Sequence, residues 1–326
     1  MPDLKLTFAC GLYDRMVPLY ARQVRPEGID LDFVVEDDPR RIFDRMGGDQ
    51  AFDVCEFSSS EHISRLSLGD SPFVALPVFP SRVFRHGFVI VNKRAGIRTA
   101  KDLEGKRVGV PLYTMSAALW IRGHLQHDYG VDLSNIEWVQ GAVNTAGAHG
   151  TPTVPPLLKP VKIVNNTSSK SLSQLLAEGE IQALIGAVLP DSLKTSPDVV
   201  RLFPDYVEVE RALYRNRKIF PVMHLIAIRR AVYEKHPFIA RSLYDAFCKS
   251  KDHALAAMRF DGALRYMLPW LQRDVEEIDD VFGGDPWPYG IEPNRPTLTA
   301  QIAYMHEQGM IREPMPIENL FVPTDK

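Results

Sequence analysis

Short apolar runs alternate with stretches of helical periodicity through the first hundred residues. We expect strands at residues 4–10, 29–35 and 52–57, each followed by a helix that begins near a capping or turn residue. This alternation is typical of βαβ units built around a largely parallel sheet. The chain is therefore predicted to be an α/β protein.

The same alternation starts again after residue 97, which indicates a second lobe. A chain of 326 residues also exceeds what one hydrophobic core usually spans. We interpret the apolar run IFPVMHLIAI, residues 219–228, as the return of the chain to the first lobe. The prediction is a discontinuous first lobe, residues 1–90 plus 220–326, and an inserted second lobe, residues 91–219.

Helical periodicity dominates the C-terminal part of the sequence. We expect helices at residues 231–259, 262–272 and 297–307. A loop rich in Gly, Pro and Thr is expected at residues 141–160, and its length is typical of a functional or mobile segment.

The charge balance and the apolar content exclude several classes of protein. There are 38 basic and 41 acidic residues, so the chain lacks the basic excess of a nucleic-acid-binding protein. No segment reaches the ~18 consecutive apolar residues of a membrane-spanning helix. The 45% hydrophobic content is enough for a large core, so we expect a soluble globular protein.

Cysteine usage and the N-terminus indicate a cytoplasmic protein. The three cysteines, Cys10, Cys55 and Cys248, are odd in number and have neither a CxxC pair nor zinc-ligand spacing. The first fifteen residues carry charges of both signs and no apolar run long enough for a signal peptide. We therefore expect a cytoplasmic location and no disulfide framework.

Two phrases at predicted strand-to-helix turns resemble type II periplasmic binding proteins. They are FDVCEFSSSEHI at residues 52–63 and DLEGKRVGVP at residues 102–111. Four further phrases resemble the 4,5-dihydroxyphthalate decarboxylase family, an enzymatic branch of that fold. These are ACGLYDR at 9–15, FPSRVFRHGFVIVN at 79–92, FPVMH at 220–224 and DPWPYGIEPNR at 285–295.

The resemblance implies a two-lobed type II periplasmic-binding-protein fold with a cleft between the lobes and a helical C-terminal part. It also implies conversion of 4,5-dihydroxyphthalate to protocatechuate and CO2, without an organic cofactor. The partner would be a small aromatic dicarboxylate, and the oligomeric state, including a homo-oligomer, is left open. Two alternatives remain: a solute-binding protein for a small anion, and another enzyme of this fold, such as a futalosine-pathway enzyme of menaquinone synthesis.

Ligands of this fold face helix N-termini, whose free N–H groups favour anions. The neutral hydroxyl donors predicted at such termini are Ser58, Ser59 and Ser60 in one lobe, and Thr114 and Ser116 in the other. The alternative interpretation is that these hydroxyls only cap helices.

Residues 79–86 place two guanidinium groups beside the predicted crossing between the lobes. Arg82 and Arg85 are candidates to bind carboxylates, because a guanidinium donates bidentately and stays charged. Either arginine could instead be a surface or lobe-to-lobe ion-pair residue.

Aromatic decarboxylation requires a proton donor at the ring carbon and a group that takes or holds a phenolic proton. His86 and His224 are the predicted proton carriers, and Glu56 is a candidate base. His224 could equally be a hydrogen-bonded core histidine, and Glu56 a buried cap partner.

Three tyrosines are candidates to bond the substrate hydroxyls or to stack on its ring: Tyr13, Tyr113 and Tyr289. The alternative interpretation, and the more common one for a tyrosine, is that each only packs in the protein interior. His124 and His127 have a spacing compatible with metal binding, but a solvated helix face explains it better. We predict no metal site.

Overall fold

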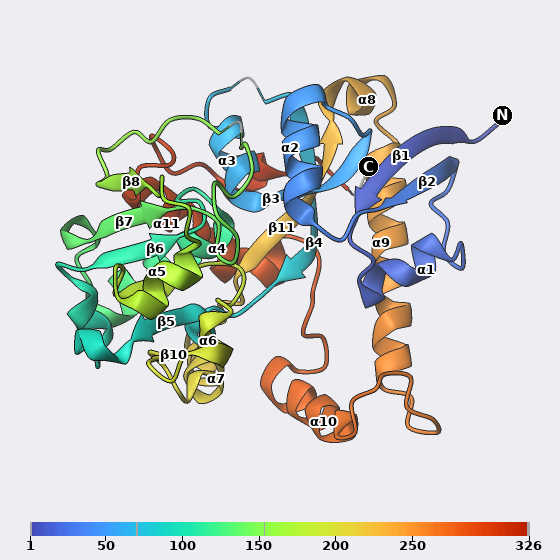
Figure 1. The fold of residues 1–326 in the computed structure, drawn as a ribbon. Coiled ribbons are helices and arrows are strands. Elements are labelled where there is room, and N and C mark those ends of the chain that lie inside the picture. The colour runs from blue at the N-terminus through green and yellow to red at the C-terminus, as the bar shows by residue number, and fades with distance from the viewer. Residues whose placement is uncertain (1, 70, 153, 325–326) are drawn as a thin grey trace. The chain divides into compact units, whose positions relative to one another are not determined.

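The computed structural model describes residues 2–69, 71–152 and 154–324. The chain divides into two compact units (Figure 1). Unit 1 comprises Met1–Arg82, His224–Leu298 and Met315–Lys326, and unit 2 comprises Val83–Met223 and Thr299–Pro314. The last segment of unit 2 comes from the C-terminal part of the chain, which the sequence pattern did not indicate.

Unit 1 is built around a five-stranded sheet with the order β2-β1-β3-β11-β4. Its strands are β1 Leu4–Cys10, β2 Ile29–Val35, β3 Val54–Ser58, β4 Phe73–Arg82 and β11 Val222–Arg229, the first two residues of β11 being grouped with unit 2. β1 is parallel to β2 and to β3, whereas β11 is antiparallel to β3. The parallel pairs of β1 with β2 and with β3 agree with the βαβ rhythm of the sequence, whereas the antiparallel β11 departs from it.

Helices cover both faces of the unit 1 sheet. The helices of unit 1 are α1 Val17–Tyr20, α2 Pro39–Asp49, α3 Ser59–Leu66, α8 Arg230–Lys235, α9 Ile239–Met258 and α10 Leu271–Phe282. Phe8 of β1 packs edge-on against Phe247 of α9, and Phe57 of β3 packs against Phe43 of α2. Because Phe8 is in register with Val54, three residues before Phe57, the two helices lie on opposite faces of the sheet (Figure 1).

Unit 2 contains a six-stranded sheet with the order β10-β5-β9-β6-β7-β8. Its strands are β5 Val89–Asn92, β6 Arg107–Val110, β7 Glu137–Gln140, β8 Ile163–Asn165, β9 Ala183–Ile185 and β10 Val199–Arg201. Its helices are α4 Ser116–Tyr129, α5 Leu172–Glu178, α6 Ser192–Thr195 and α7 Tyr206–Arg217. The helix α11, Arg295–Glu307, starts in unit 1 and ends in unit 2. Val108, Ile121 and Trp138 lie at the centre of the unit 2 core.

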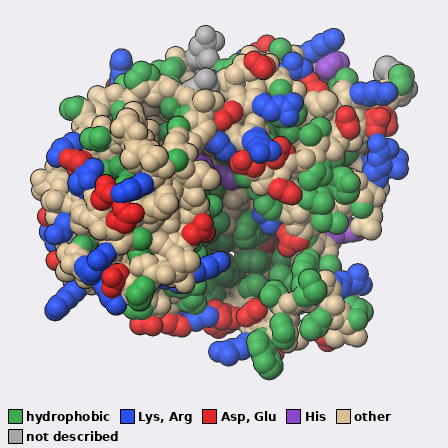
Figure 2. Space-filling view, viewed as in Figure 1, with side chains coloured by type: hydrophobic (Ala, Val, Ile, Leu, Met, Phe, Trp, Pro, Cys, Tyr) green, Lys and Arg blue, Asp and Glu red, His purple; other side chains and the backbone are tan. Residues whose placement is uncertain are grey.

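The helix predicted at residues 262–272 is wrong. The helix α10 begins only at Leu271, directly after Pro269 and Trp270. A proline disfavours helical backbone at the residue before it, which prevents a helix from running through this position. Figure 2 shows hydrophobic side chains gathered on the surface beside α10, and the exposed ones in this segment are Phe260, Leu264, Met267, Leu268 and Trp270.

The ten-residue strand β4 contains two prolines and was not predicted as a strand. β4 is an edge strand of the sheet. A proline has no backbone N–H to donate, and an edge strand tolerates this because no strand pairs with its outer side. None of the helices in the described part of the chain is long and apolar enough to span a membrane.

Candidate functional site

Polar side chains of unit 1 meet where β1 and β3 end and β11 begins. Cys10 ends β1 and Ser58 ends β3, while His224 of β11 is in register with Ser58. Directly opposed residues share a face of a sheet, and residues two apart on one strand share it as well. Glu56, Ser58 and His224 therefore project on the same face, at the sheet edge where ligands of α/β folds commonly bind.

A buried carboxylate holds the imidazole of His224. The Nδ1 atom of His224 lies 2.5 Å from Oε1 of Glu56. The Glu56 side chain has no exposed surface, whereas 17% of the His224 side chain is exposed. Because a carboxylate accepts, we assign the proton of the neutral ring to Nδ1. Nε2 has no protein partner among the described residues and is the nitrogen left for a ligand.

Three other donors complete the environment of Glu56. The Tyr13 hydroxyl donates to Oε1 at 2.8 Å, while the Gly11 N–H and the Cys10 thiol donate to Oε2 at 3.2 and 3.3 Å. Burial by itself raises the pKa of Glu56, but the charge of His224 and these hydrogen bonds outweigh it and lower the pKa below its ordinary value. Glu56 is therefore a carboxylate at neutral pH.

Tyr13 reaches Glu56 because position 11 carries no side chain. A Cβ added at Gly11 would lie 2.9 Å from the Tyr13 ring. Burial, together with the Glu56 charge, raises the pKa of the Tyr13 phenol well above its ordinary value, so it remains a protonated donor.

The start of α3 carries the three predicted serines. Ser58 is the N-cap and accepts from the Glu61 N–H, and its hydroxyl lies 3.3 Å from that of Ser60. Ser59 and Ser60 are buried. The Glu61 carboxylate makes no reciprocal capping bond, because it pairs with Arg40 of α2 at 3.4 Å.

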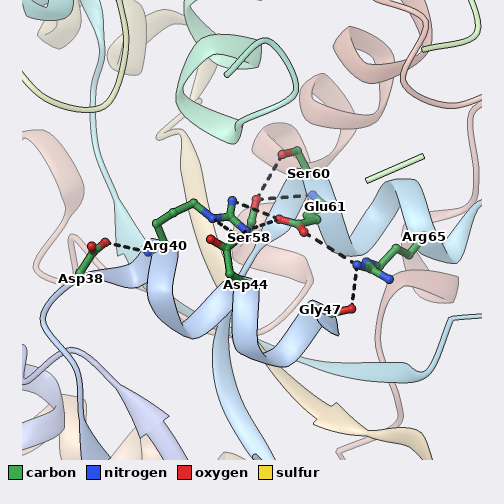
Figure 3. A network of polar contacts seen from close by, with 8 residues as sticks. All are labelled: Asp38, Arg40, Asp44, Gly47, Ser58, Ser60, Glu61 and Arg65. Atoms are coloured by element: carbon green, nitrogen blue, oxygen red, sulfur yellow. Dashed lines mark hydrogen bonds and ion pairs between the residues drawn. The ribbon is translucent and has the colours of Figure 1, made fainter. Parts of the chain in front are cut away.

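Figure 3 shows how this carboxylate is held. Arg40 of α2 and Arg65 of α3 approach Glu61 from opposite sides, and Asp44 takes the other contact of Arg40 at 2.7 Å. Burial raises the pKa of Glu61 although both guanidinium groups act to lower it. Arg40 is thus neutralised by two carboxylates, and its role is to fix α2 against α3.

Arg82, the last residue of β4, lies at the same end of the strands as His224 near the start of β11. The Arg230 N–H, just after β11, donates to the Pro72 carbonyl, just before β4, so the two neighbouring strands are antiparallel. The end of β4 therefore lies beside the start of β11. Arg82 is 4% exposed. Tyr289, the remaining predicted residue of unit 1, is buried, and its hydroxyl lacks a hydrogen-bond partner among the described residues.

Arg85 belongs to unit 2 and is used in its packing. Its Nε donates to the Met223 sulfur at 3.4 Å, and one terminal nitrogen donates to the Ala187 carbonyl at 3.2 Å. The guanidinium also lies 4.7 Å from the centre of the Phe88 ring. Burial lowers the pKa of Arg85 to about 10, so the group stays charged at neutral pH.

His86 lies in a buried polar cluster of unit 2. Its ring packs on that of His124, with centroids 5.0 Å apart. Burial, and then the nearby His124, lowers the pKa of His86 to about 3, so the ring is neutral at pH 7. Its backbone N–H donates to Glu210 at 2.8 Å. Burial raises the pKa of Glu210 to about 7, although the N–H groups of Gly87 and His86 act to lower it.

The other predicted residues of unit 2 lie around the start of α4. Tyr113 packs in the core with the Arg122 guanidinium 3.6 Å from its ring centre. The N-cap of α4 is Met115, Ser116 is the first helical residue, and the Thr114 hydroxyl is buried.

The helix face carrying His124 and His127 is only partly solvated. His124 is 3% exposed and contacts Asp128 at 2.8 Å, whereas His127 is exposed and contacts Glu307 at 2.6 Å. Across the described ranges, no group of three or more His, Cys, Asp or Glu side chains is arranged to hold a metal ion.

Two contacts of the site were not predicted from the sequence. Arg15 lies over the Tyr13 ring, and the Cys10 thiol donates to Glu56. Both belong to the phrase ACGLYDR, which already carried the resemblance. The phrase therefore indicated that these residues matter. It could not show that they contact Glu56 and Trp287, which lie far along the chain.

The chain is similar in sequence to two 4,5-dihydroxyphthalate decarboxylases. No protein-family model matches it. It is 36% identical to the 4,5-dihydroxyphthalate decarboxylase of Comamonas testosteroni over 325 residues, which is 99% of this chain and 98% of the relative. It is 37% identical to the protein of the same name from Pseudomonas putida over 206 residues, 63% of this chain and 79% of the relative.

Among solved structures, the periplasmic aliphatic sulphonate-binding protein of Escherichia coli is similar, with a TM-score of 0.53 at 12% identity. The match covers 99% of this chain and 92% of that protein. At this identity the likeness establishes the fold alone, which is the type II periplasmic-binding-protein fold expected from the sequence.

Proposed function

Because the chain belongs to the 4,5-dihydroxyphthalate decarboxylase family, we propose that it removes one carboxylate from 4,5-dihydroxyphthalate and releases protocatechuate and CO2. The observation that carries this proposal is 36% identity over 99% of the chain. The pairing of His224 with Glu56 supports it, because a histidine held by a carboxylate can supply the proton that this chemistry requires.

The proposed step is a replacement of CO2 by a proton on the ring. The bond between the ring carbon and the leaving carboxylate breaks, and its electron pair stays with the ring carbon. The same carbon gains a proton from Nε2 of protonated His224. The hydroxyl para to this carbon supplies electron density, which helps protonation to occur before or as CO2 departs.

Glu56 supports this step without touching the substrate. Its two carboxylate oxygens already accept from His224, Tyr13 and the donors of residues 10–11, which leaves neither oxygen open to a phenolic proton. Its hydrogen bond with Nδ1 instead fixes the orientation of the His224 ring. We therefore assign Glu56 a positioning role rather than that of a base.

The remaining carboxylate needs neutral donors and a cation. Ser58 is the N-cap of α3, and Ser59 and Ser60 begin the helix, so the three hydroxyls lie at the positive end of its dipole, which favours an anion. Arg82 lies at the same sheet edge and is the proposed guanidinium partner. The substrate-binding roles predicted for Tyr289, Arg85, Tyr113, Thr114 and Ser116, and the proton-carrying role of His86, stay predictions, as does a cytoplasmic location.

The assay uses the purified full chain with 4,5-dihydroxyphthalate and follows CO2 release and protocatechuate formation together. Stoichiometric appearance of both products supports the proposal. The fold also occurs in proteins that only bind a solute, so calorimetric binding of the same compound is measured in parallel. Saturable binding without either product would favour a solute-binding protein instead.

A further inference from the structure

Three segments that are distant in the sequence meet at the guanidinium of Arg15. Its carbon Cζ lies 4.4 Å from the centre of the Tyr13 ring and 4.4 Å from that of the Trp287 ring. Its Nε donates to the Pro80 carbonyl at 2.8 Å. The Trp287 indole N–H donates to the neighbouring Phe79 carbonyl at 2.7 Å. The end of β4 thus anchors both Arg15 and Trp287.

This arrangement fixes the plane of the Tyr13 ring. A guanidinium within about 6 Å of an aromatic face is attracted to it, and the second ring within the same range restrains the guanidinium further. Only 14% of the Arg15 side chain is exposed, which strengthens such an interaction. The hydroxyl of the same Tyr13 ring donates to Glu56 Oε1, the atom that also contacts His224.

We propose that Arg15 and Trp287 are positioning residues for the decarboxylation, acting through the Tyr13 hydroxyl on the pair Glu56–His224. Arg15 holds the ring at the angle at which the hydroxyl reaches Oε1, and Trp287 holds Arg15. This inference rests on the proposed function for its effect on turnover, although the contact between Tyr13 and Glu56 can be measured without substrate.

The first measurement is a set of single and double variants. Arg15→Ala is expected to lower kcat roughly tenfold while KM stays within about twofold, because the substrate-binding groups remain. In a Tyr13→Phe background, Arg15→Ala should change kcat by less than about twofold, since the hydroxyl through which it acts is already absent. Arg45→Ala is the matched control, because Arg45 stacks on Phe52 at 4.5 Å.

The second measurement needs no turnover. With 13C-labelled glutamate, the Glu56 carboxyl resonance is assigned by its loss in Glu56→Gln. At pH 7 the resonance of Arg15→Ala should move to the position that it takes in Tyr13→Phe, whereas Arg45→Ala should leave it in place. If the wild-type protein does not release CO2, the proposed function fails, and this resonance still decides the role of Arg15.

The outcomes separate clearly. A tenfold loss of kcat from Arg15→Ala in both backgrounds, or an unmoved Glu56 resonance, would overturn the inference. Should Arg15→Ala not fold, Trp287→Ala replaces it and is expected to move the resonance in the same direction. Trp287→Phe should restore the wild-type position, because it keeps an aromatic face against the guanidinium. No restoration would also count against the proposal.

Discussion

His224 and Glu56 contact each other diagonally across the neighbouring strands β11 and β3, with Nδ1 2.5 Å from Oε1. Register explains the contact, since His224 opposes Ser58 and Ile226 opposes Glu56. The carboxylate is completely buried, and the imidazole is its link to the accessible part of the site.

Glu56→Gln should lower kcat by roughly 10²-fold, because a neutral amide holds the orientation of the His224 ring less firmly than a carboxylate does. The amide also brings an NH2 group among four donors, which should cost about 1–3 kcal/mol of unfolding free energy. Steady-state kinetics and urea denaturation measure the two effects. Wild-type kcat in a folded Glu56→Gln protein would count against the role of Glu56.

Gly11→Ala should lower turnover by displacing Tyr13. The added Cβ would come within 2.9 Å of the phenol ring, so the ring must move away from Glu56. We expect a loss of kcat at least as large as that of Tyr13→Phe. Gly48→Ala is the control, since a Cβ there meets no atom within 4 Å and the residue lies in α2. Equal kinetics for both alanine variants would contradict the prediction.

Arg82→Ala and Arg85→Ala should differ in what they change. Arg82→Ala is expected to raise KM about tenfold, because we propose that it binds a substrate carboxylate. Arg85→Ala should first lower the unfolding free energy, by about 2 kcal/mol, since its guanidinium is bonded inside unit 2. Kinetics and thermal denaturation of both variants test this. Unchanged KM in Arg82→Ala would remove Arg82 from the binding site.

Glu210 should make the protein less stable as the pH rises from about 4.5 to about 7. Its folded-state pKa is about 7 against an ordinary value of 4.5. Between these values the unfolded chain releases the proton and the folded chain keeps it, which favours unfolding. Below pH 4.5 both states are protonated and the effect vanishes.

Glu210→Gln should remove this pH-dependent loss, which is on the order of 2 kcal/mol. The comparison is urea denaturation of the wild type and the variant at pH 4.5, 6 and 8. Parallel pH profiles for the two proteins would show that the Glu210 proton does not contribute.

The regular part of unit 1 was predictable from local patterns. The strands β1 and β2 have the predicted boundaries. Each is a seven-residue segment rich in apolar residues, and a glycine marks one end of each, Gly11 after β1 and Gly28 before β2. β4 was not predicted, since its prolines indicate a break unless the strand lies at a sheet edge. That position is a property of the whole sheet and cannot be seen in the segment itself.

The candidate site was only partly predictable for a similar reason. Glu56 and His224 were selected individually, but their contact joins residues 168 positions apart. The contacts of Arg15 with the Tyr13 and Trp287 rings likewise join segments far apart in the sequence. Sequence patterns therefore selected the candidate residues one by one, while the sheet register determined which of them touch.

The central claim is that His224 delivers the proton, and single-turnover CO2 release tests it most directly. Wild-type protein, His224→Asn and the control His253→Asn, at an exposed position of α9, are mixed in excess with 4,5-dihydroxyphthalate. We predict that His224→Asn binds the substrate within a few-fold of wild type but releases CO2 10²–10⁴-fold more slowly, on the order expected for losing a general acid. His253→Asn should match the wild type. Equal CO2 release by His224→Asn and wild type would contradict the account.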